Sequence, residues 1–253
     1  MSQLKKKALF LGLLLAFCVE GQAQEKGDWE LQLNIGAAVP TGDLGESLND
    51  KSGFAQTGRS IGFNLYAPIV KKVYLTFGYS NISMKVNRSE YDSYSENALR
   101  SSLSRDLYVT RNFLYKSSLE NYSNNVVMVG LNFDIEINEK IEFYLNPTAS
   151  YSWFNVPDVS IVVTDSLYSV GSSQTTDVEP SFGFQINGGV KFKASDQLKL
   201  NLQTAFHYSE HSFDAETSTV NQNNEAFVTK QVGTSVFSAF VFSIGLQFKL
   251  SKE

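Results

Sequence analysis

The chain is poor in cysteine, in long hydrophobic runs and in clusters of basic residues. Its one cysteine, Cys18, lies near the start of a chain of 253 residues. Around it stand Lys5–Lys7, an apolar run from Ala8 to Val19, and then Gly21-Gln-Ala23. A positive segment, a short apolar core and small residues are typical of a cleaved secretory signal. Spanning a bilayer takes about 20 apolar residues, so residues 1–23 are predicted to be a signal peptide.

These shortages exclude several classes of protein. Residues 24–253, the predicted mature chain, contain no cysteine, so they can form neither an internal disulfide nor a thiolate metal site. Loss of residues 1–23 leaves 18 of the 21 basic and 25 of the 26 acidic residues. An acidic chain without a basic cluster argues against nucleic acid as a partner. No later apolar run approaches the length of a transmembrane helix, which excludes a helical inner-membrane protein.

Alternation of apolar and polar residues is what the chain has in abundance. In the first stretch, Leu31, Leu33 and Ile35 share one face, while Gln32 and Asn34 share the other. Seven more stretches keep such a parity, beginning near residues 61, 73, 127, 141, 182, 198 and 236. Each is about 8–12 residues long, near the roughly 9–11 that a tilted strand needs to cross hydrocarbon. Strict alternation predicts strands with one apolar face.

The connections between these stretches are short and long in turn. Tight ones lie at 68–72, 138–140 and 194–197, and long ones at about 40–58, 81–124, 154–181 and 209–233. Short periplasmic turns and long extracellular loops are typical of outer-membrane barrels, whereas a soluble β-sandwich has no reason to keep this order. The pattern predicts an all-β fold: an eight-stranded antiparallel up-and-down transmembrane β-barrel with periplasmic termini. Aromatic residues, which prefer the headgroup level, gather at both strand ends: Tyr79, Tyr151, Trp153, Phe182 and Tyr208 at one, and Trp29, Phe143, Phe192 and Phe248 at the other.

The last stretch reads Ser-Ile-Gly-Leu-Gln-Phe-Lys-Leu. It resembles the polar-x-Gly-x-x-aromatic-x-apolar signal by which the outer-membrane assembly machinery recognises its clients, with Ser243, Gly245, Phe248 and Leu250 in the signal positions. Segments 36–45 and 66–79 resemble the small outer-membrane β-barrel domain family of Gram-negative bacteria, the OmpX/OmpW-like eight-stranded barrels. The resemblance implies an outer-membrane location, contact with lipid and lipopolysaccharide, and the assembly machinery as a partner in biogenesis. It implies no particular activity, because the family is functionally mixed.

The barrel interior is predicted to hold an ionic plug at the turn end. Eight strands leave an interior that side chains just fill, and buried charges must be paired. A narrow path for ions or small solutes is the alternative. The residues expected in the plug are Glu30, Asp134, Glu136 and Glu142, with Lys191, Lys193, Lys199 and Lys249.

The connection 81–124 is far longer than an ordinary loop. It is rich in Tyr and Arg, which are enriched at binding hot spots. Strands extending across 104–116 or a short helix across 96–104 fit its middle, and 159–163 offers another strand extension. The segment is predicted either to bind a partner or to pack on itself. Its candidate binding residues are Tyr91, Tyr94, Arg100, Arg105, Tyr108, Arg111 and Tyr115.

One short motif suggests chemistry. His207-Tyr-Ser209 resembles the His-x-Ser pair of the outer-membrane lipid A deacylases, in which histidine activates a serine nucleophile. The chain continues with Glu210-His211 where that family carries Asn-Ala. Parity also places His207 on the inner face, whereas a lipid hydrolase must present its pair to the membrane.

We therefore expect a non-enzymatic, surface-exposed protein with a structural or interaction role. One such role is that of an accessory subunit bound to an outer-membrane protein partner. A lipid A acyl hydrolase and a small-solute conduit are the alternatives, and an open porin is disfavoured because it needs roughly 16 strands. No cofactor is expected. No metal is expected either, because Asp43, Glu46 and Asp50 match no calcium-loop spacing.

Overall fold

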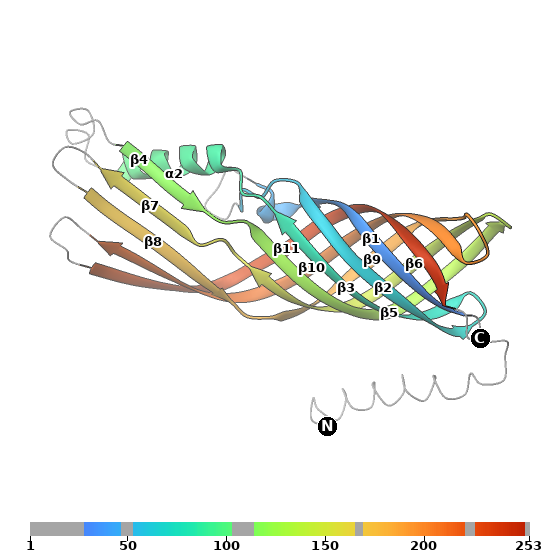
Figure 1. Ribbon diagram of the computed structural model, residues 1–253. Coiled ribbons are helices and arrows are strands. Elements are labelled where there is room, and N and C mark those ends of the chain that lie inside the picture. The colour runs from blue at the N-terminus through green and yellow to red at the C-terminus, as the bar shows by residue number, and fades with distance from the viewer. Residues whose placement is uncertain (1–27, 47–52, 103–113, 165–168, 221–225, 251–253) are drawn as a thin grey trace, which may run out of the picture.

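The computed structural model describes residues 28–46, 53–102, 114–164, 169–220 and 226–250 (Figure 1). The predicted signal peptide lies outside these residues. The described residues contain a 3-10 turn, one helix and eleven strands. In chain order these are β1 (Trp29–Pro40), η2 (Gly42–Leu44), β2 (Gly58–Val70), β3 (Val73–Met84), α2 (Arg88–Ser102), β4 (Leu114–Leu119), β5 (Tyr122–Asn138), β6 (Ile141–Asn155), β7 (Val159–Thr164), β8 (Ser169–Val178), β9 (Ser181–Lys193), β10 (Leu198–Val220) and β11 (Ala226–Leu250).

Eight strands close into a ring in the order β1-β2-β3-β5-β6-β9-β10-β11. The last strand returns to the first: Ile244 of β11 lies opposite Ile35 of β1 on one side and opposite Leu202 of β10 on the other. All eight pairings are antiparallel. Closure gives every strand of the ring a partner on both sides, which a sheet in hydrocarbon requires. The predicted eight-stranded antiparallel barrel is confirmed.

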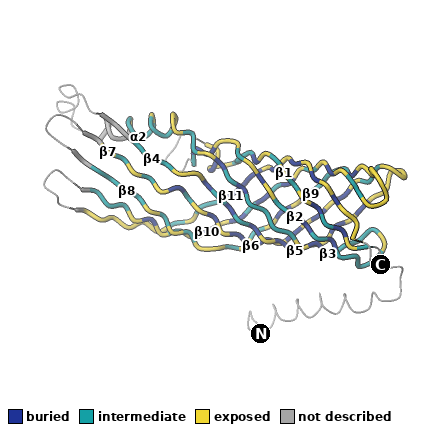
Figure 2. Tube along the Cα trace, viewed as in Figure 1, coloured by how far each residue is buried: buried dark blue, intermediate teal, exposed yellow. Residues whose placement is uncertain are grey.

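The two faces of the ring are inverted relative to a soluble protein. Large apolar side chains point outward and remain exposed, such as Ile35 at 61% and Ile244 at 50%. The inner face holds buried amides, including Asn132, Asn146 and Asn201. Figure 2 shows buried and exposed residues alternating along the strands. An exposed apolar belt of this extent needs a hydrocarbon surrounding.

None of the helices among the described residues is both long and apolar enough to cross a membrane.

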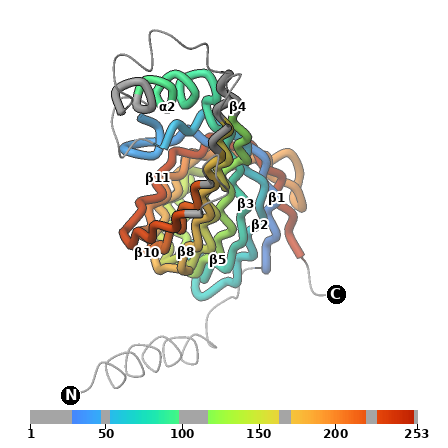
Figure 3. Tube along the Cα trace, turned by 90° about the vertical axis from the view of Figure 1, so that its left-hand side faces the viewer, coloured from blue at the N-terminus to red at the C-terminus, as the bar shows by residue number. Residues whose placement is uncertain are grey.

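Beyond one end of the ring, the sheet continues as an open structure (Figures 1 and 3). The long strands β10 and β11 stay paired as far as Val220 opposite Ala226. Strand β8 pairs with residues 213–220 of β10, β7 pairs with β8, and β4 pairs with β7. We call β4, β7, β8 and residues 213–220 and 226–236 the sheet extension. A strand as long as β11, with 25 residues, reaches on the order of 80 Å at about 3.3 Å per residue.

The sheet extension corrects the predicted loops. The range 209–233 is a β-hairpin except for residues 221–225, which lie outside the description, and 154–181 contains β7 and β8. Outside hydrocarbon both faces of a strand can be polar, so these strands lack the lipid-facing alternation that marks the ring. The helix in the connection 81–124 begins eight residues earlier than predicted, at Arg88 rather than near residue 96. Residues 114–116 of the predicted strand extension belong to β4, and 159–163 lie in β7 as predicted.

Candidate functional site

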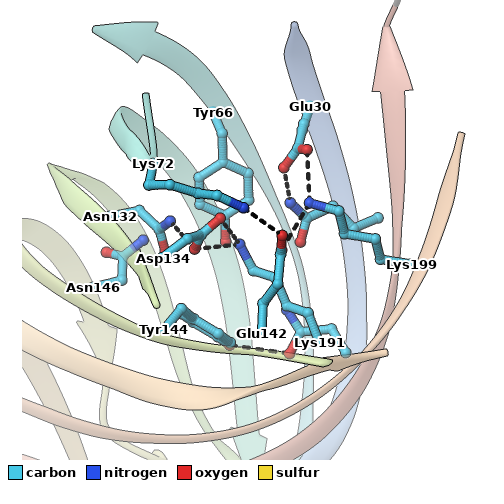
Figure 4. Close-up of polar contacts among 12 residues, drawn as sticks. Glu30, Tyr66, Lys72, Asn132, Asp134, Glu142, Tyr144, Asn146, Lys191 and Lys199 are labelled. Carbon is cyan, nitrogen blue, oxygen red and sulfur yellow. Dashed lines mark hydrogen bonds and ion pairs between the residues drawn. The ribbon is translucent and has the colours of Figure 1, made fainter. Parts of the chain in front are cut away.

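The barrel interior near the turns is filled by an ion pair between two aromatic rings (Figure 4). Lys191 Nζ lies 2.7 and 2.9 Å from the two carboxylate oxygens of Asp134, with both side chains out of solvent. The same ammonium lies 5.2 Å from the ring centre of Tyr66 and 4.9 Å from that of Tyr144. Asn132 donates a further hydrogen bond to Asp134, at 2.6 Å. A buried charge that is paired in this way and covered by ring faces is satisfied without water.

A second group of charges lies beside this pair. Lys199 Nζ is 3.0 Å from Glu30 Oε1 and 3.0 Å from Glu142 Oε2. Lys72 Nζ is 2.9 Å from Glu142 Oε1 and 3.0 Å from Glu136 Oε2. Glu136 and Glu142 are direct neighbours across β5 and β6, and such like charges repel. Lys72 therefore bridges two carboxylates that would otherwise oppose each other.

Six of the eight residues expected in the plug belong to this lumen network: Glu30, Asp134, Glu136, Glu142, Lys191 and Lys199. The other two do not. Lys193 pairs with Asp196 in the β9–β10 turn and Lys249 pairs with Asp28 at the rim, because both lie where their strands leave the ring. Lys72 also belongs to the lumen network, although strand alternation did not predict it. It lies in the β2–β3 turn with a positive φ of 68°, and strand parity makes no prediction for a turn residue.

Aromatic side chains form a second seal at the opposite end of the lumen. Tyr122 stacks on Phe154 with ring centres 5.8 Å apart, and Phe154 contacts Phe237 at 5.1 Å. Phe154 and Phe237 are fully buried. Between the two seals lies a cavity of about 20 Å³, room for about one water molecule. The ion pairs and the aromatic layer thus occupy the lumen near its two ends.

The predicted His-Ser pair lies inside the barrel. His207 and Ser209 are both 0% exposed and face the lumen, not the lipid. The hydroxyl of Ser209 is 2.9 Å from His211 Nε2 but 3.5 Å from His207 Nε2. His211 Nδ1 donates to the carbonyl oxygen of Glu179 at 3.0 Å, which leaves Nε2 to accept from Ser209. The geometry needed for a lipid hydrolase, with the pair facing the membrane, is therefore absent at His207 and Ser209.

Residues 41–46 and 53–57, which we call the β1–β2 segment, fold over the end of the lumen that carries the sheet extension (Figure 1). Thr41 N donates to the carbonyl oxygen of Ser238 at 3.0 Å, and the Tyr122 hydroxyl donates to that of Gly53 at 2.6 Å. Leu44 of the β1–β2 segment is buried. Between this segment and the inner face of the sheet extension lies a cavity of about 510 Å³, which we call the vestibule. Its walls come from Asp43, Leu44 and Gly53, from Tyr122 and Val156, from Gln174 and Thr176 of β8, from Phe213 of β10, and from residues 231 and 233–236 of β11.

The Tyr-rich connection packs partly on the chain itself. Tyr91 lies edge-on to Phe54 at 5.5 Å, and Tyr94 contacts the same ring at 5.5 Å. Burial raises the pKa of the Tyr91 phenol. The side chains of the other candidate binding residues lie outside the described ones: Arg100, Arg105, Tyr108, Arg111 and Tyr115.

Two smaller predictions concern a signal and a metal. Ser243 and Gly245 of the predicted assembly signal face the lumen, whereas Phe248 and Leu250 are 37% and 45% exposed on the outer face. Asp50 lies outside the description, and the described residues contain no group of three or more His, Cys, Asp or Glu that could hold a metal ion.

No protein-family model and no curated protein matches the chain. Solved structures do match it, with probability 1.00. Neisserial surface protein A is 12% identical with a TM-score of 0.45, covering 88% of this chain and 97% of its own. OprG from Pseudomonas aeruginosa is 10% identical with a TM-score of 0.47, covering 90% and 99%. The Escherichia coli outer-membrane protease OmpT is 9% identical with a TM-score of 0.39, covering 90% and 98%.

These likenesses concern the fold, and the chain's own closed ring and exposed apolar belt decide its class. The chain is an eight-stranded transmembrane β-barrel. Its lumen is filled near both ends, so the features available to other molecules are the sheet extension and the vestibule. The sheet extension lies at the end of the barrel away from the tight turns (Figure 1). The vestibule is lined by residues of this extension.

Proposed function

We propose that this barrel is a non-enzymatic protein of the outer membrane that displays the sheet extension outside the cell for interaction with other molecules. The observation that carries the proposal is the contrast between the two parts of the barrel. Seven charged residues and an aromatic layer occupy the lumen, whereas an ordered sheet of five strands projects beyond the apolar belt. Rigid barrels carry function on the segments that project from them.

Side chains on the sheet extension support an interaction role. Phe227, Val228 and Val232 of β11 are 59%, 54% and 77% exposed, although they lie beyond the belt that faces lipid. Pairing of β11 with β1 ends at Ala239. Before Ala239 in the chain, this edge of β11 has no partner strand among the described residues. Exposed apolar residues on an open strand edge are suited to contact another protein chain.

Cysteine labelling tests the orientation, because the predicted mature chain has no cysteine of its own. Val228→Cys places a thiol on the sheet extension, and Lys140→Cys places one in the β5–β6 turn. A polyethylene-glycol maleimide too large to pass porins should label the first variant on intact cells and the second only after the outer membrane is permeabilised. Labelling of Lys140→Cys alone on intact cells would reverse the orientation and overturn the proposal.

A photo-crosslinking residue tests the interaction role in the same cells. Placed at Val228 or Val232, it should yield a defined product with another molecule. The control position is Ile244, which is exposed on the same strand but faces lipid. The same products at all three positions, or none at either extension position, would contradict an interaction role.

A further inference from the structure

The vestibule has walls of a distinct chemical kind. Uncharged hydrogen-bonding side chains line it, among them Gln174, Thr176 and Gln231. Its one charged lining residue is Asp43, and no Lys, Arg or His is among the lining residues. Among the described lining residues, a phosphate or carboxylate ligand would therefore meet no positive charge and one negative charge. The cavity favours a ligand that is uncharged and rich in hydrogen-bonding groups.

A buried hydroxyl in the wall points to such a ligand. Thr176 Oγ1 is shielded from solvent and has no hydrogen-bond partner among the described residues. Such groups are rare, because buried polar atoms in native proteins are nearly always paired. Thr176 lies opposite Ala215, which in turn lies opposite Gln231. The small side chain of Ala215 leaves space between a hydroxyl on β8 and an amide on β11.

Aromatic rings supply the apolar part of the cavity. The Phe213 ring lies against Gly233, where an added Cβ would come within 2.9 Å of the ring. Glycine thus lets this ring lie close to the backbone of β11. Tyr122 is held by its stacking on Phe154 and by its hydrogen bond to Gly53. Walls fixed in this way lose little conformational freedom when a ligand binds.

We propose that the vestibule binds an uncharged saccharide. Sugar hydroxyls pair with the side chains of Gln174, Thr176 and Gln231, and the C–H faces of the sugar pack on Tyr122 and Phe213. The volume of about 510 Å³ falls in the range of about 300–1,000 Å³ that is common for small-molecule sites. This proposal rests on the proposed function, because the vestibule meets external saccharides only if the sheet extension lies outside the cell.

Binding is measured on the barrel refolded into phosphatidylcholine nanodiscs, by saturation-transfer NMR and by calorimetric titration. The probes are an array of uncharged glycans together with maltose, lactose and N,N′-diacetylchitobiose, and glucuronic acid serves as the charged comparison. At least one uncharged saccharide should bind at the site. Its affinity should fall about tenfold in Thr176→Val and in Gln231→Leu, as loss of a hydrogen bond in a closed site does.

The matched control is Thr175→Val, the same change one residue away on the opposite, exposed face of β8, which should bind as the wild type does. Heat-modified migration on gels verifies that each variant is folded. The proposal fails if no uncharged glycan binds, if Thr176→Val and Gln231→Leu bind like the wild type, or if glucuronic acid binds more tightly than the uncharged probes.

The saccharide can be free or can be part of lipopolysaccharide, and a second set of nanodiscs separates these sources. If lipopolysaccharide in the nanodisc competes with the free probe, its sugars occupy the vestibule. If the affinity for the probe is unchanged, the site serves a free saccharide. Nanodisc binding is independent of orientation in the cell. If Val228→Cys is labelled on intact cells but no saccharide binds in nanodiscs, only the saccharide proposal is overturned. If Val228→Cys is not labelled on intact cells, the proposed function is overturned.

Discussion

Lys191 and Asp134 form an ion pair inside the barrel, between the rings of Tyr66 and Tyr144. The pair joins β9 to β5, the two strands that flank β6 in the ring, and so connects strands that are not direct neighbours. Its neighbours, Lys199 and Lys72, connect further strands in the same way. The lumen network thus acts both as a seal and as a set of contacts across the ring.

Lys191→Met should destabilise the barrel by about 3–5 kcal/mol, because it leaves the carboxylate of Asp134 buried without its partner. Urea unfolding in phospholipid vesicles measures the change. The control is Lys193→Met on the same strand, whose partner Asp196 is exposed, so solvent already screens that pair and a much smaller effect is expected. The double variant Lys191→Met/Asp134→Leu should recover part of the loss. Equal stability of the two single variants would contradict a structural role for the buried pair.

Alternation predicted the ring because one rule applies along each strand. Parity alone places Asp134 and Lys191 inward and Ile35 and Ile244 outward, as the structure has them. Parity does not say how far along the barrel a residue lies. Lys193 and Lys249 follow the rule but stand at strand ends, where they reach other partners.

The sheet extension and the vestibule could not be predicted in this way. Beyond the belt, neither face of the sheet meets hydrocarbon, so residues such as Thr175 and Thr176 give no apolar alternation although they lie on opposite faces. The vestibule is assembled from segments far apart in the chain, among them Asp43, Tyr122 and Gln231. Local patterns carry no information on such contacts.

Substitutions at two exposed apolar positions of β11 should separate the membrane-facing part from the sheet extension. Ile244→Arg should cost about 2–4 kcal/mol, as a cation near the middle of the bilayer does on the lipid face of a barrel. Val232→Arg, at a residue that is more exposed than Ile244 (77% against 50%), should be almost neutral because it lies in water. Urea unfolding in vesicles compares the two. Similar costs at both positions would contradict the placement of the belt.

The wild-type barrel should give no resolved conductance in planar bilayers, because its lumen is filled at both ends. Glu136→Ala should remain silent too. Glu136 is the outermost member of the network, with its side chain 50% exposed, and Lys191 and Asp134 still fill the lumen above it. A sixteen-stranded porin in the same bilayers is the positive control. Conductance in the wild type that rises in Glu136→Ala would favour the ion path.

Lipid A from cells that express the barrel should keep all its acyl chains, and Ser209→Ala should change nothing. Ser209 faces the lumen and donates to His211, so it cannot reach an acyl ester in the membrane. Mass spectrometry counts the acyl chains of lipid A, and a strain that carries the empty vector is the reference. Loss of one acyl chain that Ser209→Ala restores would show that the barrel is a hydrolase.

Tyr122→Phe should loosen the β1–β2 segment without unfolding the ring. The change removes the hydrogen bond to the carbonyl oxygen of Gly53, which contributes about 1 kcal/mol, while the ring can still stack on Phe154. Hydrogen exchange should quicken at the amides of Ala55 and Gln56, which donate to Leu44 and Lys85. The control is Tyr151→Phe, whose ring packs with Trp153 and Phe182 on the outer face and should leave those amides unchanged.

Exchange in the ring strands should be the same in both tyrosine variants, since neither hydroxyl holds the barrel closed. If Tyr122→Phe also quickens exchange at Val126 and Met128 of β5, the tyrosine stabilises the ring itself rather than the wall of the vestibule. If no amide of the β1–β2 segment responds, the hydrogen bond to Gly53 does not hold this wall. The rigidity on which saccharide binding depends must then come from the pairing of Thr41 with Ser238.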